Sequence, residues 1–209
     1  MKSMAGERLD RARLDSLGIE GDRVVHVEDA RGHVVSARTH PRLLAHRATL
    51  AASGEPLVDG APWTQSEARR SVVDIVGPGA RLVRDDSARR FDVLPLLVAT
   101  DGAIAAFGYD GRRLRPNIVV GGVQGLAERS WPGRCLRVRD VVIGVQDLRA
   151  RCVMTTFDPD TLAQDPKVLR RIAREFGGQL ALNCSVIRGG EIHVGDSVDL
   201  VECATLKAP

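Results

Sequence analysis

The sequence predicts a mainly β protein with a few short helices, arranged as a mixed-β barrel. Hydrophobic residues make up 44% of the 209 residues but aromatic residues only 3%, so Val, Leu, Ile and Ala supply the apolar content. Val-rich runs separated by turn residues, many of them glycine, favour short strands. Many such strands with few helices, without an internal repeat or a long linker, are typical of a barrel.

The first third of the chain contains two predicted hairpins, each with Asp and Gly in its turn. Their strands are residues 24–27 with 33–35 and residues 57–58 with 61–63. Between the hairpins, the spacing of Leu and Ala over residues 41–52 predicts a short helix.

Three further helices are predicted in the rest of the chain. The first begins near Ser66 and ends before Gly77; a small one follows Asp101, and a mainly polar one over residues 166–176 ends at a Gly pair. The remaining apolar runs are predicted strands: residues 80–84, 95–100, 118–120, 136–138, 141–145, 180–182, 184–187 and 190–201. We expect a β lobe over residues 1–65 and a β-barrel core over residues 66–209.

Composition excludes several classes of protein. The net charge is +3, arginines are spread along the chain and stacking aromatics are few, so we expect no nucleic-acid partner. No 18-residue apolar run and no apolar leader are present, so we expect neither a membrane span nor a secretory signal. The four cysteines form no C-x-x-C pair, which indicates free thiols in a reducing cytoplasm.

Two sequence blocks offer chemistry. Arg115 and Asn117 flank a proline, which sets a guanidinium and an amide on a stiffened backbone suited to an oxyanion or heterocycle. An Arg-Pro turn that closes a strand is the commoner explanation of this block. Cys152 follows Arg151, and an adjacent cation stabilises a thiolate, a soft ligand for a thiophilic metal. The alternatives for Cys152 are a buried strand cysteine or a nucleophile paired with a histidine.

Other polar residues are weaker candidates. The run that follows Cys152 is rich in Thr and Asp, which indicates a site wall, although Asp158 and Asp160 also fit a turn or an acid/base pair. Lys2, Ser3 and Arg23 could hold a phosphate, but their spacing gives no reason to combine them. No nucleotide-binding glycine motif and no metal-binding histidine spacing is present.

In combination these blocks resemble the MOSC family, the molybdenum-cofactor sulfurase C-terminal domain and its relatives. The mitochondrial amidoxime reducing component and its bacterial counterparts are the most similar members. The matching motifs run in the family's order over nearly the whole chain: Lys2-Ser3, Gly21-Asp22-Arg23, Phe91 to Pro95, Arg115 to Ile118, Glu128 to Trp131, Arg151-Cys152 with Thr155 to Pro159, and Ile192 to Asp196. The Arg-Pro-Asn and Arg-Cys-x-x-Thr-Thr-x-Asp-Pro motifs are specific in combination.

The resemblance implies a β-barrel core, a smaller N-terminal β lobe and a molybdopterin cofactor in the cleft between them. It implies that Cys152 supplies a thiolate to molybdenum and that Asp92 is a carboxylate near the metal that accepts or relays a proton. The cofactor-binding positions it implies are Lys2, Ser3 and Arg23 for the phosphate, and Arg115, Asn117 and Arg151 for the pterin.

The resulting hypothesis is a monomeric oxidoreductase that reduces N-hydroxylated small molecules. Because the sequence has no ferredoxin, haem or flavin motif, a separate redox protein must donate the electrons. The alternative is a protein that carries the cofactor or its sulfur without turnover. A third possibility is a degenerate domain with an empty cleft.

Overall fold

A computed structural model describes residues 1–203 of the chain, and these residues form two compact units built from interleaved segments. The predicted segments 1–65 and 66–209 are each continuous in sequence. The first unit contains Met1–Arg8, Gly21–Asp92 and Phe157–Gln164. The second unit contains Leu9–Glu20, Val93–Thr156 and the described residues from Asp165 onward.

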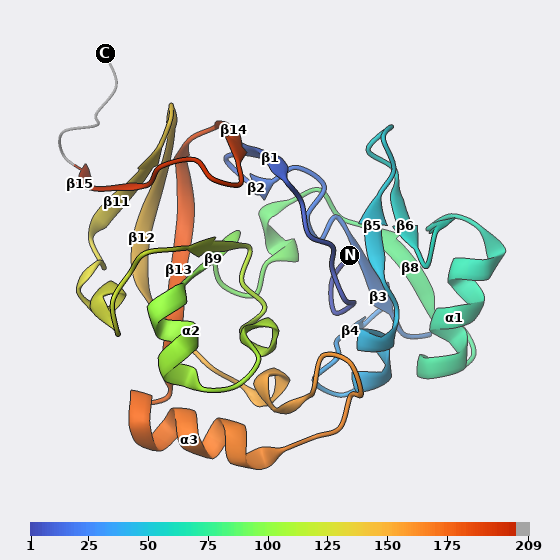
Figure 1. The fold of residues 1–209 in the computed structure, drawn as a ribbon. Coiled ribbons are helices and arrows are strands. Elements are labelled where there is room, and N and C mark those ends of the chain that lie inside the picture. Colours follow the sequence, from blue (N-terminus) through green and yellow to red (C-terminus); the bar gives the residue numbers. More distant parts are fainter. Residues whose placement is uncertain (204–209) are drawn as a thin grey trace. The chain divides into compact units, whose positions relative to one another are not determined.

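The first unit contains two three-stranded antiparallel sheets, in the orders β4-β3-β8 and β5-β6-β7. The strands are β3 (Val25–Glu28), β4 (Val34–Val35), β5 (Ala48–Leu50), β6 (Pro56–Val58), β7 (Ala61–Pro62) and β8 (Arg81–Arg84). Helix α1 (Ser66–Val76) lies beside β8 (Figure 1), and it buries Ala68 and Val72. Both predicted hairpins are confirmed, and Asp59 and Gly60 both have positive φ, as a tight two-residue hairpin turn requires.

The predicted helix over residues 41–52 is wrong for most of its length. Only a 3-10 turn forms, Pro41–Ala45, and His46 is already extended. Ala48 and Thr49 then pair with β6. The Leu and Ala spacing is compatible with a helix, but hydrogen bonding to a neighbouring strand outweighs this weak local preference.

The second unit contains a six-stranded sheet of order β10-β9-β13-β12-β11-β15 and a three-stranded sheet β14-β1-β2. In the six-stranded sheet only β9 and β10 pair in parallel. The strands are β1 (Arg11–Asp15), β2 (Gly18–Ile19), β9 (Leu96–Thr100), β10 (Ile118–Val120), β11 (Arg134–Val138), β12 (Val141–Ala150), β13 (Gln179–Arg188), β14 (Gly190–His193) and β15 (Asp199–Glu202). The predicted strand over residues 190–201 is thus two strands, because the chain turns at Gly195, which has φ +94°.

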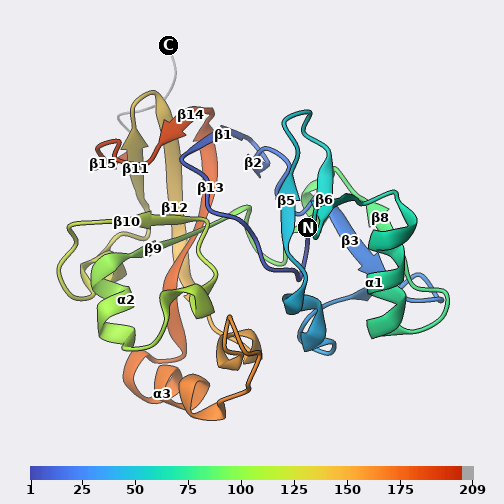
Figure 2. The same ribbon diagram turned by 45° about the vertical axis from the view of Figure 1, so that its right-hand side comes forward.

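Two hydrophobic clusters stabilise the second unit. One lies on a face of the six-stranded sheet and includes Leu96, Ile143 and Leu182. The other joins α2 (Asp101–Phe107) to α3 (Pro166–Phe176) through Phe107 and Ile172. The two helices lie on the same side of the sheet strands in both views (Figure 1 and Figure 2). The predicted fold class, mainly β with a few short helices, is confirmed.

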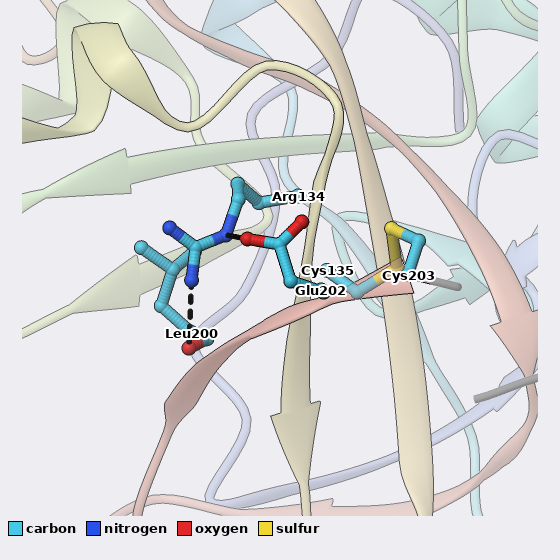
Figure 3. Close-up of a disulfide and its surroundings, with 5 residues drawn as sticks. All are labelled: Arg134, Cys135, Leu200, Glu202 and Cys203. Carbon is cyan, nitrogen blue, oxygen red and sulfur yellow. Dashed lines mark hydrogen bonds and ion pairs between the residues drawn. A yellow bond between two sulfur atoms is a disulfide. The ribbon is translucent and has the colours of Figure 1, made fainter. Parts of the chain in front are cut away.

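The prediction of four free thiols is wrong for two of them. Cys135 on β11 and Cys203, directly after β15, form a disulfide. Arg134 and Glu202 form an ion pair beside it, and the Arg134 Nη2 donates to the Leu200 carbonyl (Figure 3). The disulfide therefore fastens the last described strand to its neighbour. Over residues 1–203, no helix has the length and apolarity needed to cross a bilayer.

Candidate functional site

Cys152 lies just beyond the end of β12, where the chain leaves the sheet. The next element, a 3-10 turn over Val153–Thr156, is held by the Thr155 N–H and hydroxyl, which both donate to the Cys152 carbonyl. Cys152 is unbridged and partly exposed. The other unbridged cysteine, Cys184, is fully buried, and burial raises the pKa of its thiol to about 12. Cys152 is therefore the accessible thiol of the described chain.

Arg151 presents an unsatisfied buried donor next to this thiol. Its Nη2 donates to the Leu114 carbonyl at 2.6 Å, and its backbone N–H donates to the Gly178 carbonyl at 2.9 Å. Its Nε is enclosed and has no hydrogen-bond partner. Burial, followed by the positive charges of Arg149 and Arg115, lowers the pKa of Arg151 to about 10. A buried N–H without an acceptor is costly in free energy. A group bound at this site would supply the missing acceptor and remove that cost.

Arg115 and Asn117 lie on the segment that leads into β10. Arg115 ends the 3-10 turn Gly111–Leu114 in the left-handed conformation, with φ +55°. The Asn117 Oδ1 accepts from the Leu97 N–H at 2.9 Å, and the Asn117 N–H donates to the Leu97 carbonyl at 2.8 Å. Asn117 therefore extends the pairing of β9 with β10, a structural role that the sequence did not indicate.

In the first unit, Asp92 lies between two cations. Its Oδ1 is 2.8 Å from the Lys2 Nζ, and its Oδ2 accepts from the Arg38 Nη2 at 2.6 Å. The Lys2 N–H also donates to the Val25 carbonyl, which fixes the start of the chain against β3. Sequence reasoning did not identify Arg38, which is separated by more than thirty residues from either partner.

Arg23 and Ser3 belong to the same unit. The Arg23 guanidinium lies 5.6 Å from the centre of the Phe91 ring, and its Nη1 is 3.6 Å from an Asp22 carboxylate oxygen. Ser3 has φ +69°, a conformation uncommon for a non-glycine residue. Phe91 adjoins Asp92, so the fold brings Arg23 into the neighbourhood of the Lys2–Asp92 pair.

The predicted site residues thus form one group in each unit. Lys2, Ser3, Arg23 and Asp92 lie in the first unit, and Arg115, Asn117, Arg151 and Cys152 lie in the second. Asp158 has the turn role, because its Oδ1 accepts from the backbone of Asp160 and from Thr161. Sequence reasoning assigned no role to Arg149 and did not identify Asp147 or Asn183.

A metal at Cys152 would need ligands from outside the protein. Over residues 1–203, no three His, Cys, Asp or Glu side chains gather in a way that could hold a metal ion. A single cysteine sulfur, a soft ligand, close in sequence to several arginines fits an anionic cofactor that brings its own metal and most of its ligands. The residues of the second unit therefore fit a sulfur-ligated, negatively charged metal cofactor.

Family comparison identifies the chain. The model of the MOSC domain matches residues 102–199, and the model of the MOSC N-terminal beta barrel domain matches residues 1–75. The chain belongs to the MOSC family. MOSC domains are associated with molybdenum-cofactor-binding proteins. No curated protein matches the chain.

Solved structures with a similar fold include two bacterial proteins. The YuaD protein from Bacillus subtilis is 15% identical, with a TM-score of 0.49 over 94% of this chain and 87% of that one. YiiM from Geobacillus stearothermophilus is 16% identical, with a TM-score of 0.42. That match covers 52% of this chain and 54% of YiiM, so the chain spans about half of that protein.

Proposed function

We propose that this MOSC protein binds the molybdenum cofactor and reduces N-hydroxylated small molecules. Two adjacent residues carry the proposal. Cys152 has an accessible thiol, and the Nε of Arg151 is enclosed and has no hydrogen-bond partner. A thiolate suits molybdenum and an unsatisfied guanidinium N–H suits an anionic pterin, so both features are explained by one ligand.

Each predicted residue has an assignment in this proposal. In the second unit, Cys152 ligates the metal, and Arg115, Asn117 and Arg151 bind the pterin. In the first unit, Lys2, Ser3 and Arg23 bind the cofactor phosphate. When bound, the cofactor would supply the redox chemistry for the reduction of the N-hydroxyl group.

The chain's own residues orient the ligand and manage protons. The Leu114 carbonyl holds the Arg151 guanidinium by one Nη, which leaves its Nε to donate to the ligand. In this proposal Asp92, which the Lys2 Nζ and the Arg38 Nη2 hold in place, is the carboxylate that accepts or relays a proton. Electrons come from a separate redox protein, because the chain has no electron-carrier motif of its own.

The test uses the full chain expressed in cells that make the cofactor. We expect molybdenum and pterin to co-purify with the protein, and an amidoxime to be reduced with an artificial electron donor. Cys152→Ser exchanges a soft ligand for a hard one of similar volume, so activity falls by at least about a hundredfold while the fold is kept. Cys184→Ala, which removes the buried thiol, retains the bound molybdenum.

Two outcomes contradict the proposal. If wild type and Cys152→Ser contain the same molybdenum and reduce the substrate equally, Cys152 is not the metal ligand. If wild type binds the cofactor and passes it to an apo-enzyme faster than it reduces substrate, the chain is a carrier.

The cellular location is a separate question. The expectation of a cytoplasmic protein was based on free thiols, and the Cys135–Cys203 disulfide weighs against it, because disulfides are rare in reducing compartments. Alkylation of thiols at the moment of cell lysis decides the matter, since a cytoplasmic protein would show both cysteines reduced.

A further inference from the structure

A buried amide links two charged residues near the end of β12. Asn183 on β13 is buried, and its Nδ2 donates to the Asp147 carboxylate. Its Oδ1 accepts from the Arg149 Nη1 at 3.3 Å. The amide therefore holds the Arg149 guanidinium from one side and is itself held by Asp147.

Two irregularities in the sheet direct these side chains away from the core. The pairing of β12 with β13 shifts between Val145 and Asp147 and again between Leu148 and Ala150. Leu148 packs against the hydrophobic cluster of the sheet. Because side chains alternate along a strand, Asp147 and Arg149 point to the opposite face. Bulges commonly re-aim side chains next to functional sites.

The sheet register connects this amide to the candidate site. Asn183 pairs in register with Leu97, and Leu97 bonds to Asn117. The chain continues from Arg149 to Arg151 and Cys152, and the Nε of Arg151 is enclosed without a hydrogen-bond partner. Two guanidinium groups only two residues apart in sequence, Arg149 and Arg151, are stabilised together by a ligand with negative charge.

We infer that Arg149 is a further anion-binding residue of the Cys152 site, positioned by Asn183 and Asp147, and that this face binds a doubly charged oxyanion group. The inference rests on the proposed function, since it adds a residue to the same site. Its chemistry is that of a metal-oxo or phosphate dianion, for which molybdate and inorganic phosphate are the separate probes. Arg149 supplies charge and N–H donors, while Asn183 is a positioning residue.

The test is calorimetric titration of the full chain, free of cofactor, with molybdate and with inorganic phosphate. Arg149→Gln raises the Kd for the bound anion about tenfold, because it removes one charge-assisted hydrogen bond to the anion. Asn183→Ala keeps the positive charge of Arg149 but removes the hydrogen bond that orients its side chain, so we expect a smaller rise in the Kd, of about threefold. Arg174→Gln is the matched control, because it removes the same charge from the exposed face of α3.

A second readout separates binding from structure. Without anion, Arg149→Gln relieves repulsion with Arg151 and keeps or raises the melting temperature. A lowered melting temperature with an unchanged Kd shows that Arg149 is only structural and overturns the inference, as does a wild type that binds neither anion.

Failure of the proposed function and failure of the Arg149 inference give different experimental results. If wild type takes up no cofactor in cells but binds molybdate with the stated dependence on Arg149, the oxidoreductase proposal fails and the Arg149 inference stands. If the cofactor binds through Cys152 and Arg149→Gln changes neither the Kd nor the cofactor content, the inference alone fails.

Discussion

The disulfide between Cys135 and Cys203 allows a quantitative prediction. The perturbation is Cys203→Ser, which leaves the fully buried Cys135 as a thiol and removes the bond. The two cysteines are 68 residues apart in sequence. For a closed loop of that length, the chain-entropy relation gives about 15 cal/mol/K, or about 4 kcal/mol at 25 °C, by which the bond restricts the unfolded state.

Other contacts replace little of this stabilisation. Strand β15 keeps its pairing with β11, and its ion pairs, Arg134–Glu202 and Arg137–Asp199, are largely exposed. Exposed pairs contribute about 0–1 kcal/mol each. Because engineered and natural disulfides often deliver less than the entropic value, we expect the free energy of unfolding to fall by about 2–4 kcal/mol.

The assay is urea denaturation without reductant in a Trp63→Phe background, followed by the fluorescence of Trp131, which then reports on the second unit. Wild type treated with dithiothreitol should unfold at the same urea concentration as Cys203→Ser, and reductant should leave the variant unchanged. The reasoning is refuted if wild type unfolds identically with and without reductant. It is also refuted if all four cysteines of the non-reduced, unfolded protein react with an alkylating agent.

Two further substitutions test the second unit. Glu128 is fully buried, with Oε2 3.3 Å from the Thr100 hydroxyl and Oε1 unpartnered, and burial raises the pKa of its carboxyl above 4.5. The native state thus keeps this proton to a higher pH than the unfolded chain, so stability is lost as the pH rises above about 4.5. In Glu128→Gln, we expect this loss to shrink by up to about 1.4 kcal/mol per pH unit in urea denaturation between pH 4.5 and 7. For Gly102, an added Cβ would meet the Val123 carbonyl and lie 2.5 Å from the Gly125 carbonyl oxygen, so Gly102→Ala lowers the free energy of unfolding by about 3 kcal/mol.

Each of these substitutions has a matched control. Glu20→Gln alters an exposed carboxylate of the same unit and should leave the pH slope unchanged. Equal slopes in wild type and Glu128→Gln would contradict the account of Glu128. A Cβ at Gly121 would only touch the Asp101 carboxylate at 3.8 Å, so Gly121→Ala should shift stability by no more than about 0.5 kcal/mol. Equal free energies of unfolding for Gly102→Ala and Gly121→Ala would contradict the crowding at Gly102.

Local patterns predicted the elements that are stabilised locally. The Asp59-Gly60 turn and the helix closed by Gly177 depend on residues adjacent in sequence, and both form as expected. The strand Arg11–Asp15 was missed as a distinct element, because Arg and Asp surround its two inward residues. The helix expected after Pro41 did not form over most of its length, because residues 48–50 pair with a strand six to ten residues further along the chain.

By itself, the sequence determined the β-rich class, most strand positions, the family, and Cys152 and its neighbours as candidates. Only the tertiary structure decided that Cys135 bonds to Cys203, that Asp92 lies between Lys2 and Arg38, that Arg151 keeps an unpartnered Nε, and that Asn183 holds Arg149. The physical reason is the distance along the sequence over which each interaction acts. Turn and cap preferences act over a few residues, whereas ion pairs, disulfides and burial depend on which distant segments pack together, and no local pattern encodes that.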